Sequence, residues 1–201
     1  MRSTVHKPRR RGRIVSPKIV DRRGLVWSDL LAVAGSLMAE RGVATISVEQ
    51  LLLAAGISRG TFYSFCGGKS DLVAAIVIPA LEQGTARLEP LGTSPPPRII
   101  PAIVSIYEEL WQNHRHALIM IPGVTADAFA RIHDAHRAFT DAMSRALERA
   151  RAGGQLRNDS VEATFRVITR TAVPLLRIYH DHPDGQRLYR ESMTALLGRN
   201  P

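Results

Sequence analysis

Apolar residues along this chain recur mainly at the spacing of α helices, in blocks separated by glycine and proline. In residues 25–41 the apolar positions advance by four, three and four residues, at Val26, Leu30, Val33 and Leu37. That spacing places them on one side of a helix, where they would be buried as a stripe. The alternation of apolar and polar residues that is typical of strands is scarce, so we expect an all-α protein.

Residues 45–69 predict two short helices joined by a tight turn. Ser47 and Gln50 form an S-x-x-Q capping box, in which both side chains bond free amides at a helix start. Gly56 can adopt the left-handed conformation that ends a helix, and Ser58 then caps a second helix of about two turns. A helix, a glycine-containing turn and a short capped helix form a helix-turn-helix, whose second helix lies in the major groove of DNA.

The rest of the chain predicts about six further helices. Their expected ranges are about 69–89, 98–113, 116–121, 127–152, 160–181 and 184–197. Pro79 is expected to kink or break the first of these near Ile78, because proline lacks an amide and clashes with the preceding turn. Residues 91–97 contain three consecutive prolines and predict an exposed loop, while Leu156 is expected to return to the core.

Positive charge is concentrated at the N-terminus. Residues 1–23 contain nine of the 27 basic residues and one of the 18 acidic residues, so they carry +8 of the formal net charge of +9. Proline, glycine and like-charge repulsion predict a disordered arm. Its arginines could enter a narrow A·T minor groove, or the arm could act only as a solvated tail. The candidate DNA contacts in the arm are Arg9, Arg10, Arg11 and Arg13.

Cysteine content and hydropathy indicate a cytoplasmic protein. The single cysteine, Cys66, excludes an intrachain disulfide and is compatible with a reducing compartment. No apolar run approaches the roughly 18 residues that span a membrane, and the basic N-terminus is not followed by the apolar segment of a secretory signal. We therefore expect no association with a membrane.

Residues 30–72 resemble the DNA-binding domain of TetR-type bacterial transcriptional regulators. The matching residues are Glu40-Arg41-Gly42, Thr45, Ser47-Val48, Ala54-Ala55-Gly56-Ile57-Ser58, Gly60-Thr61-Phe62-Tyr63, Lys69 and Leu72. Leu52, Cys66 and Gly68 depart from the family pattern, in which alanine, phenylalanine and serine are usual at these positions. The resemblance implies a three-helix head and a larger helical C-terminal domain that binds a ligand and dimerises. The expected division is an arm over 1–23, a DNA-binding domain over 24–78 whose fourth helix continues as a linker, and a ligand-binding and dimerisation domain over 79–201.

The helix-turn-helix suggests a role for each exposed residue of the head. Arg59 can form a bidentate pair with guanine or clamp a phosphate, and Thr61 can contact a thymine methyl group or a base edge. Gly60 would allow a close approach of the backbone to DNA. Five further residues are placed to contact phosphates: Thr45, Ser47, Tyr63, Ser64 and Lys69. The expected partner is double-stranded DNA with a palindromic operator, whose half-sites lie about one turn apart, roughly 34–36 Å.

The resemblance also implies a small-molecule pocket and a homodimer. The candidate pocket residues are Tyr107, Trp111, Met120, Phe129, His136, Phe139 and Thr169, each of which could instead be ordinary core. Their largely apolar character favours a lipophilic effector over a charged one. The implied dimer interface uses the last two long helices, through Val173, Leu176, Arg177, Tyr189, Met193 and Leu196. The expected protein is thus a ligand-responsive repressor, although the sequence leaves activation open.

Two other functions stay open. An architectural DNA-binding protein would share the head and lack an effector. A metal-responsive sensor would use the histidine pairs His114/His116, His133/His136 and His180/His182, but no cysteine partner or zinc-specific spacing accompanies them. The chain contains no nucleophile elbow, phosphate-binding glycine loop or recognisable carboxylate pair, so we expect neither an enzyme nor a cofactor. Pro79 could act as a joint that transmits ligand binding, or only bend its helix.

Overall fold

The computed structural model describes residues 17–199, with side chains from residue 22 onward. These residues form eight α helices and three short 3₁₀ turns, and no named strand occurs among them. The α helices are α1 (Pro17–Arg41), α2 (Val48–Ala55), α3 (Arg59–Phe65), α4 (Lys69–Leu88), α5 (Ile99–Met120), α6 (Ala126–Ala152), α7 (Val161–Tyr179) and α8 (Gly185–Leu197). The 3₁₀ turns are η1 (Glu89–Thr93), η2 (Pro96–Arg98) and η3 (Ile121–Gly123). The prediction of an all-α protein is confirmed for this part of the chain.

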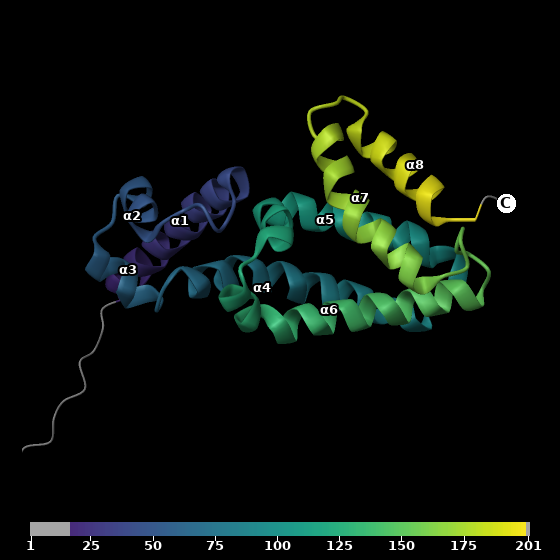
Figure 1. Cartoon of the computed structure of the whole chain (residues 1–201), viewed down its shortest axis with the longest axis horizontal. Helices are drawn as coiled ribbons and strands as arrows, with labels where there is room; N and C mark the ends of the chain where they lie inside the picture. The colour runs from purple at the N-terminus through teal and green to yellow at the C-terminus, as the bar shows by residue number, and fades with distance from the viewer. Residues whose placement is uncertain (1–16, 200–201) are drawn as a thin grey trace, which may run out of the picture.

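The helices form two groups that follow the order of the chain (Figure 1). α1, α2 and α3 make a small group at one end, which we call the head, and α4 leads from it into a larger group with α5 to α8, which we call the body. In the body α4 packs most extensively against α6 and α5, and α7 packs against α8. A three-helix head followed by a larger helical domain agrees with the predicted architecture.

Local capping explains why α2 and α3 begin and end where they do. The amide of Ser47 donates to Gln50 Oε1 at 2.8 Å, and the amide of Gln50 donates to Ser47 Oγ at 3.2 Å. Gly56 ends α2 with φ 63° and ψ 30°, in the left-handed region that glycine adopts without strain. Ser58 Oγ accepts from the amide of Thr61 at 3.0 Å and starts α3. The predicted helix-turn-helix is confirmed.

The core of the head is built around α1, but on a different stripe from the one that we predicted. Leu30, Ala34 and Met38 are fully buried, whereas the predicted positions beside Leu30 are only partly buried: Val26, Val33 and Leu37. The buried stripe advances by four residues at each step, and Leu51 of α2 and Phe62 of α3 are buried with it. Small and flexible side chains on α1 allow the other two helices to pack closely against it.

Helix α1 begins earlier than the sequence suggested. Its first residue is Pro17, so residues 17–23 are helical and their assignment to a disordered arm was wrong. Contacts with α3 help to stabilise this first part of α1. Arg23 Nη2 donates to the carbonyl of Ser64 at 2.7 Å, and its guanidinium lies 5.2 Å from the centre of the Phe65 ring. Trp27 stacks on the same ring at 5.3 Å. The four arm arginines at positions 9, 10, 11 and 13 lie outside the described residues.

Helix α4 continues through Pro79, so of the predicted kink or break near Ile78 the break does not occur. Val77 and Ala80 on either side of the proline are buried at 0% and 1% exposure, while Pro79 itself is exposed. Packing against α5 and α6 therefore holds the helix on both sides of the missing hydrogen bond. Whether Pro79 acts as a joint stays a prediction.

Helix α5 combines two segments that the sequence suggested were separate. The predicted helices over 98–113 and 116–121 form one element, Ile99–Met120, with a kink at His114, where φ is −141° and ψ is 31°. The body therefore has five α helices instead of the six expected. Residues 91–97 are also more ordered than a simple exposed loop, because they contribute to two 3₁₀ turns and Leu91 is buried.

The C-terminal part of the body follows the prediction closely. Leu156, between α6 and α7, is 2% exposed and confirms the expected return to the core. Its neighbour Arg157 donates its amide to the carbonyl of Leu197 at 2.9 Å, which joins this turn to the end of α8. Between residues 17 and 199 no single helix is long and apolar enough to cross a membrane, and only the bent pair Arg59–Phe65 with Lys69–Thr93 passes on length and composition together.

Candidate DNA-binding helix and internal cavity

Helix α3 turns one side to the core and the other to solvent. Phe62 is fully buried on the inner side. On the outer side the exposed residues are Arg59, Gly60, Tyr63 and Ser64. At helical spacing these four positions cover an arc of little more than a third of the circumference of the helix. Thr61 is half-buried at the edge. The structure thus brings these predicted contact residues together on one exposed surface.

Arg59 forms an ion pair with Glu49 of α2 across the turn of the motif. Both side chains are more than half exposed, so the pair contributes little to stability. A hydrogen bond from its own backbone amide, followed by that from Arg59, lowers the pKa of Glu49. Because the pair is exposed, a phosphate or a guanine can compete for the guanidinium at small cost.

Three of the predicted phosphate-binding hydroxyls, those of Thr45, Ser47 and Ser64, already form hydrogen bonds within the head. Thr45 Oγ1 lies 2.6 Å from the carbonyl of Arg41, to which it donates, and Ser64 Oγ donates to the carbonyl of Thr61 at 2.7 Å. Ser47 Oγ accepts from the amide of Gln50 as part of the capping box. These bonds explain why the residue types suit their positions without any DNA. To donate to a phosphate, Thr45 and Ser64 would have to redirect their hydroxyl protons, whereas Ser47 accepts through its oxygen and keeps its proton for another partner. Contact of these hydroxyls with phosphates stays a prediction.

Lys69 has an intramolecular role that the sequence did not suggest. Its ammonium donates to the carbonyls of Val43 at 3.0 Å and Ile46 at 2.8 Å, in the connection between α1 and α2. Two of its three N–H groups are therefore used inside the head. The partners precede Lys69 by 26 and 23 residues, so no local pattern reveals them.

Replacing Lys69 with methionine should destabilise the head. The change keeps most of the apolar stem and removes two charge-assisted hydrogen bonds, so we expect a loss of about 1.5–3 kcal/mol in the free energy of unfolding. Urea denaturation followed by circular dichroism measures it, with Arg145→Met on the exposed side of α6 as the control. Unchanged stability together with weaker DNA binding would instead assign Lys69 to phosphate contact.

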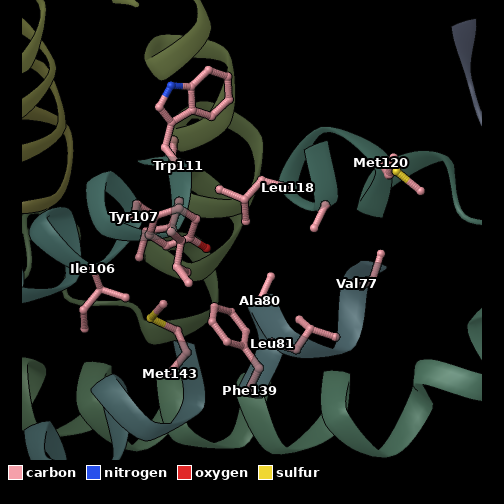
Figure 2. Close-up of a cluster of buried hydrophobic side chains, with 14 of the residues drawn as sticks. Val77, Ala80, Leu81, Ile106, Tyr107, Trp111, Leu118, Met120, Phe139 and Met143 are labelled. Carbon is pink, nitrogen blue, oxygen red and sulfur yellow. The ribbon is translucent and has the colours of Figure 1, made fainter. Parts of the chain in front are cut away.

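The body contains a cavity of about 930 Å³ between α4, α5, α6 and α7, which is partly open to solvent along α7. Four predicted pocket residues line it: Tyr107, His136, Phe139 and Thr169. Figure 2 shows side chains from several helices around this region, with the hydroxyl of Tyr107 pointing toward the side where Leu118 and Ala80 lie. Leu118 and Ala80 also line the cavity.

Three predicted pocket residues do not line this cavity, and these assignments are corrected. Met120 is 2% exposed and packs in the core. Trp111 borders a separate hollow of about 430 Å³ and donates its indole N–H to His180 Nδ1 at 3.3 Å. Phe129 is exposed on α6, where its ring lies edge-on to His136 at 5.3 Å. Helical spacing identified their apolar faces, but the direction of each face depends on the packing of whole helices.

Helix α7 supplies a larger share of the lining that the sequence analysis missed than any other helix. The residues from this helix are Phe165, Thr169, Arg170, Val173, Pro174, Arg177 and Ile178. Starting from Thr169, steps of four in both directions reach Phe165, Val173 and Arg177, so the helical period was a signal that could have found them. Instead, the prediction took a single residue from this helix.

The two titratable side chains in the interior of the cavity, Tyr107 and His136, are uncharged near neutral pH. Burial raises the pKa of Tyr107 far above its usual value, so its hydroxyl keeps its proton. Burial, followed by the nearby His133, lowers the pKa of His136, which favours the neutral imidazole near pH 7. None of the residues that line the cavity is acidic.

The predicted dimer interface divides into buried and exposed residues. Leu176, Tyr189 and Met193 are 7%, 1% and 1% exposed in the single chain, so they belong to its own core and are withdrawn from the interface. Val173 is partly buried, and Arg177 and Leu196 are exposed. Ile178, which the prediction missed, is 70% exposed and lies one position after Arg177 on α7.

The histidine pairs do not converge on a common point in the described part of the chain. His114 Nε2 lies 2.8 Å from Gln83 Oε1, and His182 Nδ1 accepts from the amide of Asp184 at 3.0 Å. Among residues 17–199 no group of three or more histidine, cysteine or acidic side chains is placed to hold a metal ion. The structure therefore supplies no observation in favour of the metal-sensor alternative.

Comparison with known proteins identifies relatives of the head and of the whole fold. Residues 30–76 match the sequence model for bacterial regulatory proteins of the tetR family. A bacterial regulatory protein in the tetR family from Rhodococcus RHA1 is 19% identical, with 88% of this chain and 98% of that chain covered and a TM-score of 0.68. The ketosteroid transcriptional regulator KstR2 of Mycobacterium tuberculosis is 20% identical over 89% and 96% of the two chains, with a TM-score of 0.70.

A third similar structure contains a small molecule. The SmeT–triclosan complex is 25% identical to this chain over 88% of it and 93% of that chain, with a TM-score of 0.60. SmeT is the repressor of the multidrug efflux pump SmeDEF of Stenotrophomonas maltophilia. The search of curated protein sequences found no match.

Proposed function

We propose, from the membership of residues 30–76 in the tetR family of bacterial regulatory proteins, that this chain is a transcriptional repressor. It binds a palindromic operator, and a small lipophilic effector releases it. The proposal includes a homodimer, in which two copies of α3 enter successive major grooves. It keeps the division into a DNA-binding domain over 24–78 and an effector-binding and dimerisation domain over 79–201. α4 crosses that boundary.

One observation carries the proposal: a single uninterrupted helix connects the head to the cavity. At its start Lys69 bonds the connection between α1 and α2, and further along Ala80 and Leu81 line the cavity. Asp71, in the first turn of α4, pairs with Arg131 of α6. A ligand that changes the spacing of α4, α5 and α6 therefore acts on the base of the head.

The mechanism is a shift between two populations of the dimer. In one population the two α3 helices have the separation of successive major grooves, and in the other they do not. An effector that binds the second population more tightly lowers the affinity for DNA, and DNA lowers the affinity for the effector by the same factor. The triclosan complex of SmeT supports an apolar ligand for a protein of this fold.

Selection of bound duplexes from a random DNA pool tests this function. A repressor of the proposed kind enriches a palindrome whose half-sites lie about one helical turn apart. Enrichment of A·T-rich DNA without a palindrome would replace the proposal with the architectural alternative. Absence of any salt-sensitive binding would reject DNA binding altogether.

The same selection should be repeated without residues 1–16, which contain six basic residues and no acidic one. Deleting as far as residue 23 would also remove the first turns of α1 and the contacts of Arg23, so the shorter deletion isolates the arm. We expect weaker binding to all sequences and a flatter dependence of affinity on salt, because fewer counterions are released. An unaltered salt slope would show that the arm does not contact DNA.

The variant Arg59→Ala should relax sequence preference at one position of each half-site. A bidentate arginine–guanine pair contributes about 1–3 kcal/mol of discrimination, so we expect a loss of about 5- to 150-fold in preference at that position. Competition between the selected duplex and single-base variants measures it. Arg145→Ala in the body is the control. A uniform loss across all sequences would assign Arg59 to a phosphate.

A further inference from the structure

Two arginines line the cavity from the same side of α7. Arg170 and Arg177 are seven residues apart, which is close to two helical turns, and their Cα atoms are separated along the axis by about 10.5 Å. Both side chains are exposed and border the cavity, together with Val173 and Pro174 between them. This edge of the cavity, which we call the arginine rim, therefore carries two permanent positive charges.

The charge of the arginine rim has no partner within the described residues. Neighbouring arginines are paired, as Arg166 is with Glu162 at 2.7 Å and Arg190 with Glu108 at 2.7 Å. Neither Arg170 nor Arg177 forms an ion pair or a side-chain hydrogen bond with another side chain among residues 22–199. Because the cavity lining contains no acidic residue, the two guanidinium groups are the only charged groups on it at neutral pH.

The inner part of the cavity has the opposite character. Leu81, Leu110 and Phe139 are buried and line it, and they offer no hydrogen bonds to a charged group. The polar lining residues from α5 and α6 are Tyr107, His136 and Thr140, and all three are neutral. A charge placed there would lose its hydration without gaining a counterion, which is strongly unfavourable. The cavity thus separates an apolar interior from a cationic rim.

We propose that the effector is an amphipathic anion, with an apolar body in the interior and a carboxylate bound by Arg170 and Arg177. Guanidinium groups suit this role because their planar N–H donors match the two oxygens of a carboxylate. The inference rests on the proposed function, since it names the chemistry of the ligand for the same cavity. It departs from the expectation of a lipophilic effector over a charged one, because the ligand keeps an apolar body but carries a negative charge.

Calorimetric titration of the full-length protein without DNA tests the proposal. The probes are dodecanoate and 1-pyrenebutanoate, a straight-chain and a fused-ring acid, each compared with its own methyl ester. We expect each acid that fits the cavity to bind about tenfold more tightly than its ester. In the double variant Arg170→Gln/Arg177→Gln this preference should disappear, while the affinity for the ester stays within about twofold of the wild-type value.

The control variant is Arg166→Gln, which removes a charge from the same helix outside the cavity and should keep the preference for the acid. Sedimentation confirms that the variants keep the oligomeric state of the wild type. Equal binding of acids and esters, a preference that survives the double variant, or binding of none of the four probes would each overturn the proposal. None of these outcomes depends on an operator. If the DNA selection fails, the repressor proposal is rejected and the anion site is unaffected. If the calorimetric titration fails, the anion site is rejected and the repressor proposal is unaffected.

Discussion

The variant Ile178→Glu should be monomeric at concentrations where the wild-type chain forms a dimer. Ile178 is 70% exposed and Leu196 is 42% exposed, and these are the large exposed hydrophobic residues of α7 and α8. In a twofold-symmetric interface the same surface of both chains is buried, so each dimer would have to bury two new carboxylates in place of two apolar side chains. Sedimentation velocity over a range of concentrations measures the change.

Loss of the dimer should lower operator affinity by about 100-fold or more. In the dimer, binding of one head to DNA holds the second head close to its half-site, and a monomer lacks this advantage. Leu196→Glu should have the same effect, and Leu196 does not line the cavity, so this variant separates dimerisation from any change at the arginine rim. Leu25→Glu is the matched control, since Leu25 is 60% exposed on α1. An Ile178→Glu protein that remains dimeric would place the interface on another surface.

The variant Phe62→Ala should unfold the head and leave the body folded. Phe62 has 0% exposure and is the one buried side chain among the seven residues of α3. Truncating a buried phenylalanine costs about 3–5 kcal/mol, which is comparable with the whole stability of a small domain. We therefore expect DNA binding to disappear at temperatures where the wild-type protein binds.

Binding of the cavity probes separates this effect from global unfolding. The Phe62→Ala protein should still bind 1-pyrenebutanoate wherever the wild type does, because the cavity lies among α4, α5, α6 and α7. Phe129→Ala is the control, since Phe129 is 38% exposed on α6 and its truncation leaves no cavity in the core. If Phe62→Ala abolished ligand binding as well, head and body would unfold as one unit.

Local interactions explain which parts of the fold could be predicted from the sequence. The capping box joins Ser47 to Gln50, three residues later, and Gly56 stops α2 through its own backbone freedom. Both depend on a few neighbouring residues, and both were predicted. In the same way α6 ends before Gly153, α7 begins after Ser160, and α8 ends before Gly198.

Contacts between distant segments explain what could not be predicted. The sequence by itself determined where most of the helices lie, because the 3.6-residue period is a local property. It did not determine the helical start of α1 at Pro17 or the stripe of α1 that is buried. Only the tertiary structure decided whether an apolar residue lies in the core, at a cavity or on the surface. Tyr189 is buried whereas Ile178 is exposed, and Met120 packs in the core whereas Phe139 lines the cavity. The tertiary structure also decided that Lys69 bonds a connection 23 to 26 residues earlier and that two arginines of α7 reach a cavity formed by four helices. Those outcomes depend on how whole helices pack, and that packing is not encoded in any single stretch.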